Sequence, residues 1–266
     1  MNEEESEYVM SDEQVEMRHA VRFFYDLQKL RIQSGLRAGS ATAELSKRHQ
    51  TALEVRSDLL HKLELNALGD VRRTLKKFPI YDAWLKDQRG IGPTLAGVIL
   101  AEIDISRSET VSQLWSYCGL AVVDGKSQRR VKGQKANFNP WLKSKMVQIA
   151  ADCMIKSNSP WREYYDNYKH RKQHTVVEPC MACDGKHVIK KDECNNCDGG
   201  KKPAPWGRSD AHRHRAAMRY MVKMFLAELF VQWRTLKNLP VPEPYKESVL
   251  GRRHGDHGGA GLEARI

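Results

Sequence analysis

The sequence lacks a long hydrophobic run and a secretory start. Its longest apolar stretch is Leu95–Leu100 with Ala101 after it, far short of the roughly 18 to 20 residues that a membrane-spanning helix needs. The N-terminus opens Met-Asn-Glu-Glu-Glu-Ser-Glu, the opposite of the basic and then apolar start of a signal peptide. These absences exclude a membrane protein and predict a cytoplasmic one. In that compartment disulfides rarely persist, so we expect the six cysteines to be reduced or metal-bound.

Charge of one sign is missing from two segments. Residues 1–16 contain acids but no base, and residues 126–145 contain bases but no acid. The whole chain has 44 basic against 33 acidic residues, a formal net charge of +11. A basic stretch without compensating acids is either a solvated surface or a binding site for a polyanion.

The apolar pattern predicts a mainly α-helical fold. With 41% hydrophobic residues the chain can bury a real core. Residues 12–78 are expected to form a helical hairpin or coiled-coil arm, with a turn at Gly35 to Ser40 and a break at Gly69. Simple core packing and a dimer seam both remain open for this arm. The apolar positions at helical spacing are Ala20, Phe23, Phe24, Leu27 and Leu30, then Leu45, Ala52, Val55, Leu59 and Leu63.

The remaining segments divide into a second domain, an insertion and two ends. Residues 79–177 and 206–240 are expected to form a helical domain with one small β-hairpin at Asp124-Gly125. Residues 178–205 form a cysteine-rich insertion. The acidic leader 1–11 and the Gly- and His-rich tail 241–266 are expected to be disordered.

The segment Arg89-Gly90-Ile91-Gly92-Pro93-Thr94 resembles the turn of a helix-hairpin-helix. Two glycines let the backbone turn sharply and approach a phosphate, and the free amides of the next helix point at the anion. Such a turn contacts the DNA backbone rather than the bases. The predicted DNA-binding residues are therefore Arg89, Gly90, Ile91, Gly92 and Thr94, together with Lys126, Arg129, Arg130, Lys132 and Lys135 of the basic stretch.

Two further motifs can bind ligands. Cys180-x-x-Cys183 and Cys194-x-x-Cys197 have the spacing of a four-thiolate zinc site, which is structural because it leaves no open coordination position. Cys118 and Cys153 are predicted to be buried thiols. A basic face on the last long helix includes Arg213, Arg215 and Arg219; it is either a phosphate contact or a solvated surface.

Taken in order, these motifs resemble the C-terminal domain of insertion-sequence 110/116/902 transposases. The matching stretches are the hairpin with Ala101-Glu-Ile103 and Asp104-Ile-Ser106, then Leu114-x-x-Tyr117-x-Gly119-Leu120-Ala121, then Ser127 and the basic run. The resemblance covers Leu85 to Leu236, interrupted by the zinc insertion. No strand followed by a metal-binding Asp occurs in residues 1–80, so the RuvC-like half of the family is expected to be missing.

The resemblance implies a nucleophilic serine in this domain, acting with four acidic metal ligands and a guide RNA. By position that serine is Ser127. The family's serine-glycine pair is Ser127-Gln128 here, and its Gly-Leu-Ala-Pro segment ends in Val122. Glu102 and Asp104 could bind a metal in principle, but Glu102 falls within a predicted helix and Asp104 near its end, which favours solvation or helix capping instead.

The leading hypothesis is a DNA-binding protein of mobile-element or phage type. It is expected to bind the DNA backbone without sequence specificity and to associate with the nucleoid. The second is a transposase or recombinase, or its subunit, that uses Ser127 in strand transfer. The third is a factor that binds structured RNA. The expected partners are DNA, including branched DNA, a second copy bound through the N-terminal helices, and a partner nuclease; the expected cofactor is structural Zn²⁺.

Overall fold

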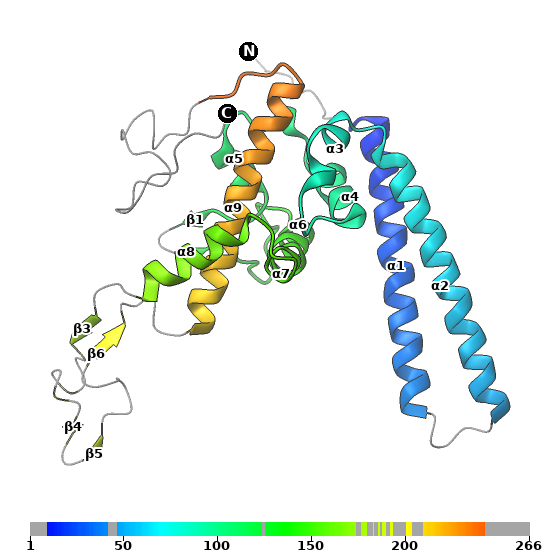
Figure 1. Ribbon diagram of the computed structural model, residues 1–266, viewed down its shortest axis with the longest axis horizontal. Coiled ribbons are helices and arrows are strands. Elements are labelled where there is room, and N and C mark those ends of the chain that lie inside the picture. Colours follow the sequence, from blue (N-terminus) through cyan, green and yellow to red (C-terminus); the bar gives the residue numbers. More distant parts are fainter. Residues whose placement is uncertain are drawn as a thin grey trace.

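The computed structural model describes residues 10–41, 47–123, 126–173, 177–179, 183, 186, 188–189, 192–193, 201–203 and 210–242. The chain is mainly helical, as predicted (Figure 1). Within the described ranges no helix is long and apolar enough to cross a membrane. Nearly all of the predicted disordered leader and tail lies outside these ranges.

The helices and strands follow one another in this order. They are α1 (Asp12–Ala41), α2 (Lys47–Leu75), α3 (Pro79–Ala83), η1 (Leu85–Asp87), α4 (Pro93–Glu102), η2 (Ile105–Arg107), α5 (Val111–Tyr117), β1 (Val122–Val123), β2 (Lys126–Ser127), α6 (Pro140–Ser144), the π-helical η3 (Lys145–Ala150), α7 (Ala151–Lys156), α8 (Arg162–Gln173), β3 (Val177–Pro179), β4 (Val188–Ile189), β5 (Asp192–Glu193), β6 (Lys201–Pro203) and α9 (Asp210–Leu236).

Helices α1 and α2 form an antiparallel pair whose distal halves project from the rest of the molecule (Figure 1). Both continue through the glycines at which breaks were expected, so the predicted turn at Gly35 and the predicted break at Gly69 are wrong. A glycine inside a helix costs only about 1 kcal/mol relative to alanine. Packing along two helices of about thirty residues exceeds that cost.

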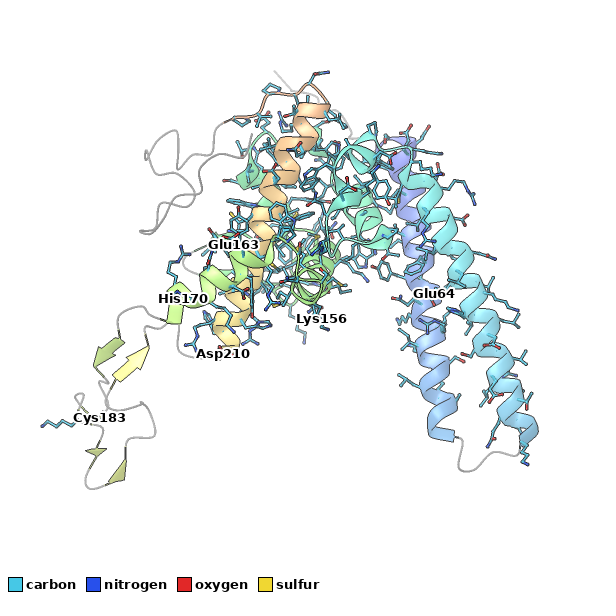
Figure 2. The ribbon with its side chains drawn as sticks, in the orientation of Figure 1. Glu64, Lys156, Glu163, His170, Cys183 and Asp210 are labelled. Atoms are coloured by element: carbon cyan, nitrogen blue, oxygen red, sulfur yellow. The ribbon has the colours of Figure 1, made fainter. Side chains whose placement is uncertain are left out.

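The seam between α1 and α2 changes character along its length. Next to the body it is apolar, with Met17, Val21 and Phe24 buried. Farther out the buried carboxylate of Glu64 accepts hydrogen bonds from Arg31 and from Gln28 (Figure 2). The Arg31 guanidinium lowers the pKa of Glu64.

Only part of the predicted apolar pattern lies in this seam. Phe24 and Leu27 are buried, but six of the predicted positions are exposed to solvent. These are Ala52 and five larger side chains that are each about half exposed, Phe23, Leu30, Val55, Leu59 and Leu63. The predicted homodimer through these helices stays a prediction.

Helix α4 lies on the side of the body that faces the arm and packs against both α1 and α2 (Figure 1). Every residue from Leu95 to Glu102 is buried. A Cβ added to Gly97 would lie 2.7 Å from Val21 Cγ2 and 3.2 Å from Val71 Cγ1. The missing side chain therefore lets α1 and α2 approach α4 closely. On the other side of the body, α9 buries Phe225, Leu229 and neighbouring apolar residues.

The last residue of α4, Glu102, buries its carboxylate among partners from other elements. It accepts a hydrogen bond from Arg22 at 3.0 Å and another from Asn139, and Arg18 Nε lies 3.4 Å away. The Arg22 guanidinium also lies over the Trp141 ring, 3.7 Å from its centroid. Neither solvation nor helix capping explains this carboxylate; it joins α1, α4 and the start of α6.

Three antiparallel strand pairs are present in the described residues. Strand β1 pairs with β2, with Val122 opposite Ser127, at the position of the predicted hairpin. Strand β3 pairs with β6 and β4 pairs with β5, both inside the cysteine-rich insertion. The sequence predicted only the first pair, from the Asp124-Gly125 turn signal, because strands of two or three residues are too short to show an alternating pattern of their own.

Candidate nucleic-acid interface

The predicted hairpin turn lies between η1 and α4, and its two glycines have different roles. Gly90 has φ +93°, and a Cβ there would lie 2.7 Å from the Met154 Cα atom on α7. Gly92 is exposed at the N-cap of α4, and a Cβ there would meet nothing within 4 Å. Gly90 is therefore needed for packing against α7, and Gly92 leaves its backbone open to a ligand.

The turn is held from the inside. Ile91 is buried, as expected for the residue between the glycines, and its amide donates to the carbonyl of Gln88 at 2.9 Å. The Gln88 side chain in turn accepts a hydrogen bond from the Trp161 indole at 3.0 Å. Contacts within the chain therefore fix the shape of the turn.

Two predicted phosphate contacts already have partners within the chain. Arg89 is exposed but donates to the carbonyl of Asn158 at 3.3 Å. Thr94 is hydrogen-bonded to Tyr25, whose pKa is raised by burial and lowered in part by that bond. Of the hairpin residues, Gly92 is the most open to an anion, and Arg89 can turn toward one only by leaving Asn158.

The basic segment forms an exposed loop with fixed ends. Arg129, Arg130, Lys132 and Lys135 are all exposed. At one end the Gln128 side chain accepts from the Ala121 amide at 3.1 Å and is buried. At the other end the Asn139 amide donates to the Tyr117 carbonyl at 2.8 Å and Phe138 is buried. This loop is the largest group of exposed predicted contacts.

The two lysines that follow the loop are less exposed than its four cations. Lys143 donates to the Gln128 carbonyl and lies over the Phe138 ring, 4.8 Å from the centroid. Lys145 lies over the Tyr25 ring, 3.1 Å from the centroid. Burial and then the charge of Arg22 lower the pKa of Lys145 to about 8.

Ser127 is half-buried on β2, directly before Gln128. In the described part of the chain no basic side chain forms a hydrogen bond with its hydroxyl. The next residue, Gln128, stands where the family has glycine. Its side chain has a structural role that glycine cannot fill, because it accepts a hydrogen bond from the Ala121 amide. The geometry therefore shows a serine at the start of a basic loop, with no general base hydrogen-bonded to it among the described residues.

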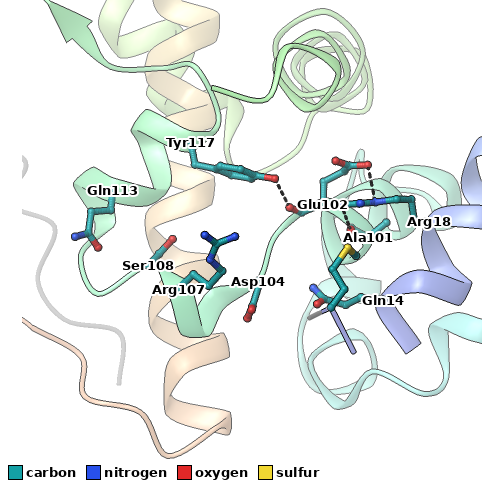
Figure 3. A pocket seen from close by; sticks show the side chains of 10 residues that line it. Gln14, Arg18, Ala101, Glu102, Asp104, Arg107, Ser108, Gln113 and Tyr117 are labelled. Atoms are coloured by element: carbon teal, nitrogen blue, oxygen red, sulfur yellow. Dashed lines mark hydrogen bonds and ion pairs between the residues drawn. The ribbon is translucent and has the colours of Figure 1, made fainter. Parts of the chain in front are cut away.

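A cavity of about 510 Å³ lies between α1 and the segment that follows α4 (Figure 3). Its carboxylates are already engaged: Glu102 with the arginines of α1, and Asp104 with the Ser106 amide at 3.0 Å, which caps η2. The capping role considered for Asp104 is confirmed. Among the described residues no group of three metal-ligating side chains occurs.

The cysteines are described only in part. Cys183 is buried in the insertion (Figure 2), and Cys180, Cys194 and Cys197 lie outside the described residues. The predicted burial of Cys118 is confirmed, and burial raises the pKa of its thiol. Cys153 is only half-buried, because its side of α7 is partly open to solvent.

Comparison with known families supports the resemblance seen in the sequence. Residues 82–166 match the model of the Transposase IS116/IS110/IS902 family. The match includes the hairpin, α4, the basic loop and Ser127, and it leaves out the arm, the insertion and α9. The resemblance is confirmed over this part of the chain, and it is consistent with the C-terminal domain of such a transposase. No curated protein matches the chain.

The two glycines of the hairpin give a matched pair of variants. We expect Gly90→Ala to lower the free energy of unfolding by about 2 kcal/mol or more, because it combines positive φ with a backbone clash. Gly92→Ala should change it by less than about 0.5 kcal/mol. Urea denaturation of both variants measures the difference, and equal losses would contradict the packing role of Gly90.

Proposed function

We propose that this protein binds the DNA backbone through the basic loop 128–139 and the exposed start of α4, and that this binding is a function of a mobile element. The family match supports a transposase-related role. The observation that carries the finer proposal is the loop: four exposed cations, no acid, and both ends fixed by buried residues.

The fixed ends matter for affinity. A mobile basic segment loses conformational entropy when it binds, whereas a loop held at Gln128 and Phe138 has lost part of that freedom already. Arginine and lysine neutralise phosphates of any sequence, and the Gly92 backbone adds a contact at a helix N-terminus. The chemistry favours backbone binding without base recognition. Association with the nucleoid follows from this proposal.

Salt dependence tests the proposal directly. The logarithm of the binding constant for duplex DNA should fall linearly with the logarithm of the salt concentration, with a slope of about −0.9 per neutralised phosphate. Replacing Arg130, Lys132 and Lys135 together by alanine should weaken binding and reduce the slope by about 1 per lost contact.

The matched control for that experiment removes three exposed cations from α2, Arg56, Lys62 and Arg72. It should leave both affinity and slope close to those of the parent. Fluorescence anisotropy at two or more salt concentrations supplies the values. If the loop variant retains the parent slope, the loop is not the contact surface.

A second candidate function is strand transfer by Ser127. It is favoured by the position of Ser127, which is half-buried at the end of β2, two residues before Arg129 of the basic loop. In such a step Ser127 Oγ bonds to phosphorus, a DNA oxygen leaves with the electron pair of the broken P–O bond, and a base accepts the serine proton. Cations of the loop would stabilise the charge that develops on the phosphate. The base and the acidic metal ligands would come from a partner nuclease.

Catalysis predicts a covalent protein–DNA adduct with nicked or branched DNA in the presence of such a partner. Ser127→Ala should abolish the adduct and leave backbone binding unchanged. Denaturing gel electrophoresis with labelled DNA detects the product. An adduct that survives in Ser127→Ala would rule out this serine as the nucleophile.

We further propose that Cys180, Cys183, Cys194 and Cys197 bind one structural zinc ion. Two Cys-x-x-Cys pairs support this assignment. The pairing of β3 with β6 and of β4 with β5 also supports it, because it brings the flanks of the insertion and its middle segments into register. Structured RNA and a second copy of the chain remain predicted partners.

Metal analysis of the purified protein should give about one zinc per chain. Cys197→Ser should lose most of that zinc, whereas Cys153→Ser, on α7, should retain it. A parent protein without zinc after purification in metal-containing buffer would refute the site.

A further inference from the structure

Four cations from three separate elements lie close together beside α9. Arg129 follows β2, Lys143 belongs to α6, and Arg215 and Arg219 lie four residues apart on α9. The fold brings them together. Lys143 donates to the carbonyl of Gln128, the residue before Arg129, and packs against Gly119 just after α5. The Trp115 indole of α5 donates to the Lys223 carbonyl on α9, one turn after Arg219, at 3.0 Å. Burial and then the charges of Arg219 and Arg129 lower the pKa of Lys143. Burial also lowers the pKa of Arg219, with Arg215 and Arg129 adding to the effect against an opposing contribution from Tyr168.

In the part of the chain that the structure describes, no carboxylate forms an ion pair with any of these four side chains. A cation on the same helix shows the contrast. Arg213 lies 3.5 Å from Asp210, at the start of α9 beside α8 (Figure 2). Asp210 also lies 3.6 Å from Lys169 of α8. On one side of α9, Asp210 therefore pairs with nearby cations. On the other side, among the described residues, cations lie near one another without a carboxylate.

Gathering like charges in a half-buried place is unfavourable unless an anion joins them. Lys143 and Arg219 are both half-buried, so water screens their repulsion less than it does at the loop. A solvated helix face, the alternative for this basic face, would leave Arg219 as exposed as Arg215 rather than half-buried. A phosphate offers charge and acceptors to all four groups, and arginine binds it in a bidentate way.

We propose that Arg129, Lys143, Arg215 and Arg219 form a phosphate-binding site, the α9 cationic site, that holds one phosphodiester group of the bound nucleic acid. This inference rests on the proposed function and extends the interface to α9, which lies outside the residues matched to the family. Arg129 belongs to both surfaces, so the site continues the basic loop into the body of the molecule.

Arg219→Gln tests the site, with Arg213→Gln as the matched control on the same helix. Duplex affinity should fall about tenfold or more in Arg219→Gln, and the salt slope should decrease by about 1. Arg213→Gln should retain both values. Arg215→Gln, which removes an exposed side chain and so should leave folding intact, is expected to resemble Arg219→Gln.

A second readout uses pyrophosphate in place of DNA. An anion that binds the folded state raises the melting temperature. Pyrophosphate should therefore raise the Tm of the parent and of Arg213→Gln, and raise it much less in Arg219→Gln. Without the anion, Arg219→Gln should melt at the parent temperature or above it, because it removes like-charge repulsion.

The outcomes separate this inference from the proposed function. If the parent binds DNA and both Arg219→Gln and Arg215→Gln bind it equally well, the α9 cationic site is wrong and the loop proposal stands. An equal pyrophosphate shift in the parent and in Arg219→Gln also overturns the site. A pyrophosphate shift that depends on Arg219 in a protein that does not bind duplex DNA supports the site and refutes the DNA proposal.

Discussion

The buried carboxylate of Glu102 is the interaction on which the arrangement of the molecule depends. A charge in a protein interior is tolerated only when it is paired and hydrogen-bonded. Its partners come from α1, through Arg18 and Arg22, and from Asn139 at the end of the basic loop. The backbone carbonyl of the same residue accepts from the Tyr117 hydroxyl at 2.7 Å. One acidic group thus fixes the direction of the arm and the place where the loop rejoins the body.

In the basic loop, one set of residues carries the charge and another set fixes the shape. Its four cations are exposed, while Gln128 and Phe138 are buried and fix its ends. The sequence could predict the cations, because a run of bases without acids is visible in one dimension. It could not predict the role of Gln128, because that role depends on the backbone of Ala121, brought close by a two-residue strand pair.

Local patterns predicted the helices well and the long-range contacts poorly. Asn139 and Pro140 are local signals for the start of α6, where the Asn139 side chain accepts a hydrogen bond from the Leu142 amide. The predicted glycine breaks in the arm failed because packing between two long helices outweighs the propensity of single residues. Gly90 and Gly92 look alike in the sequence, and only the approach of Met154 from α7 separates their roles. The gathering of Arg129 with Arg219 likewise needs the tertiary fold.

The pairing of β3 with β6 has a consequence for how this chain can vary. Val177 lies opposite Pro203, so the segment between α8 and α9 leaves the helical body and returns to it at neighbouring points. Helices α8 and α9 pack against each other beyond that segment, and the Tyr165 hydroxyl lies 2.7 Å from His214 Nδ1 across their interface. Residues can be added to or removed from the insertion without altering the spacing of these helices. The length and the sequence of the insertion can therefore change while α8 and α9 keep their packing.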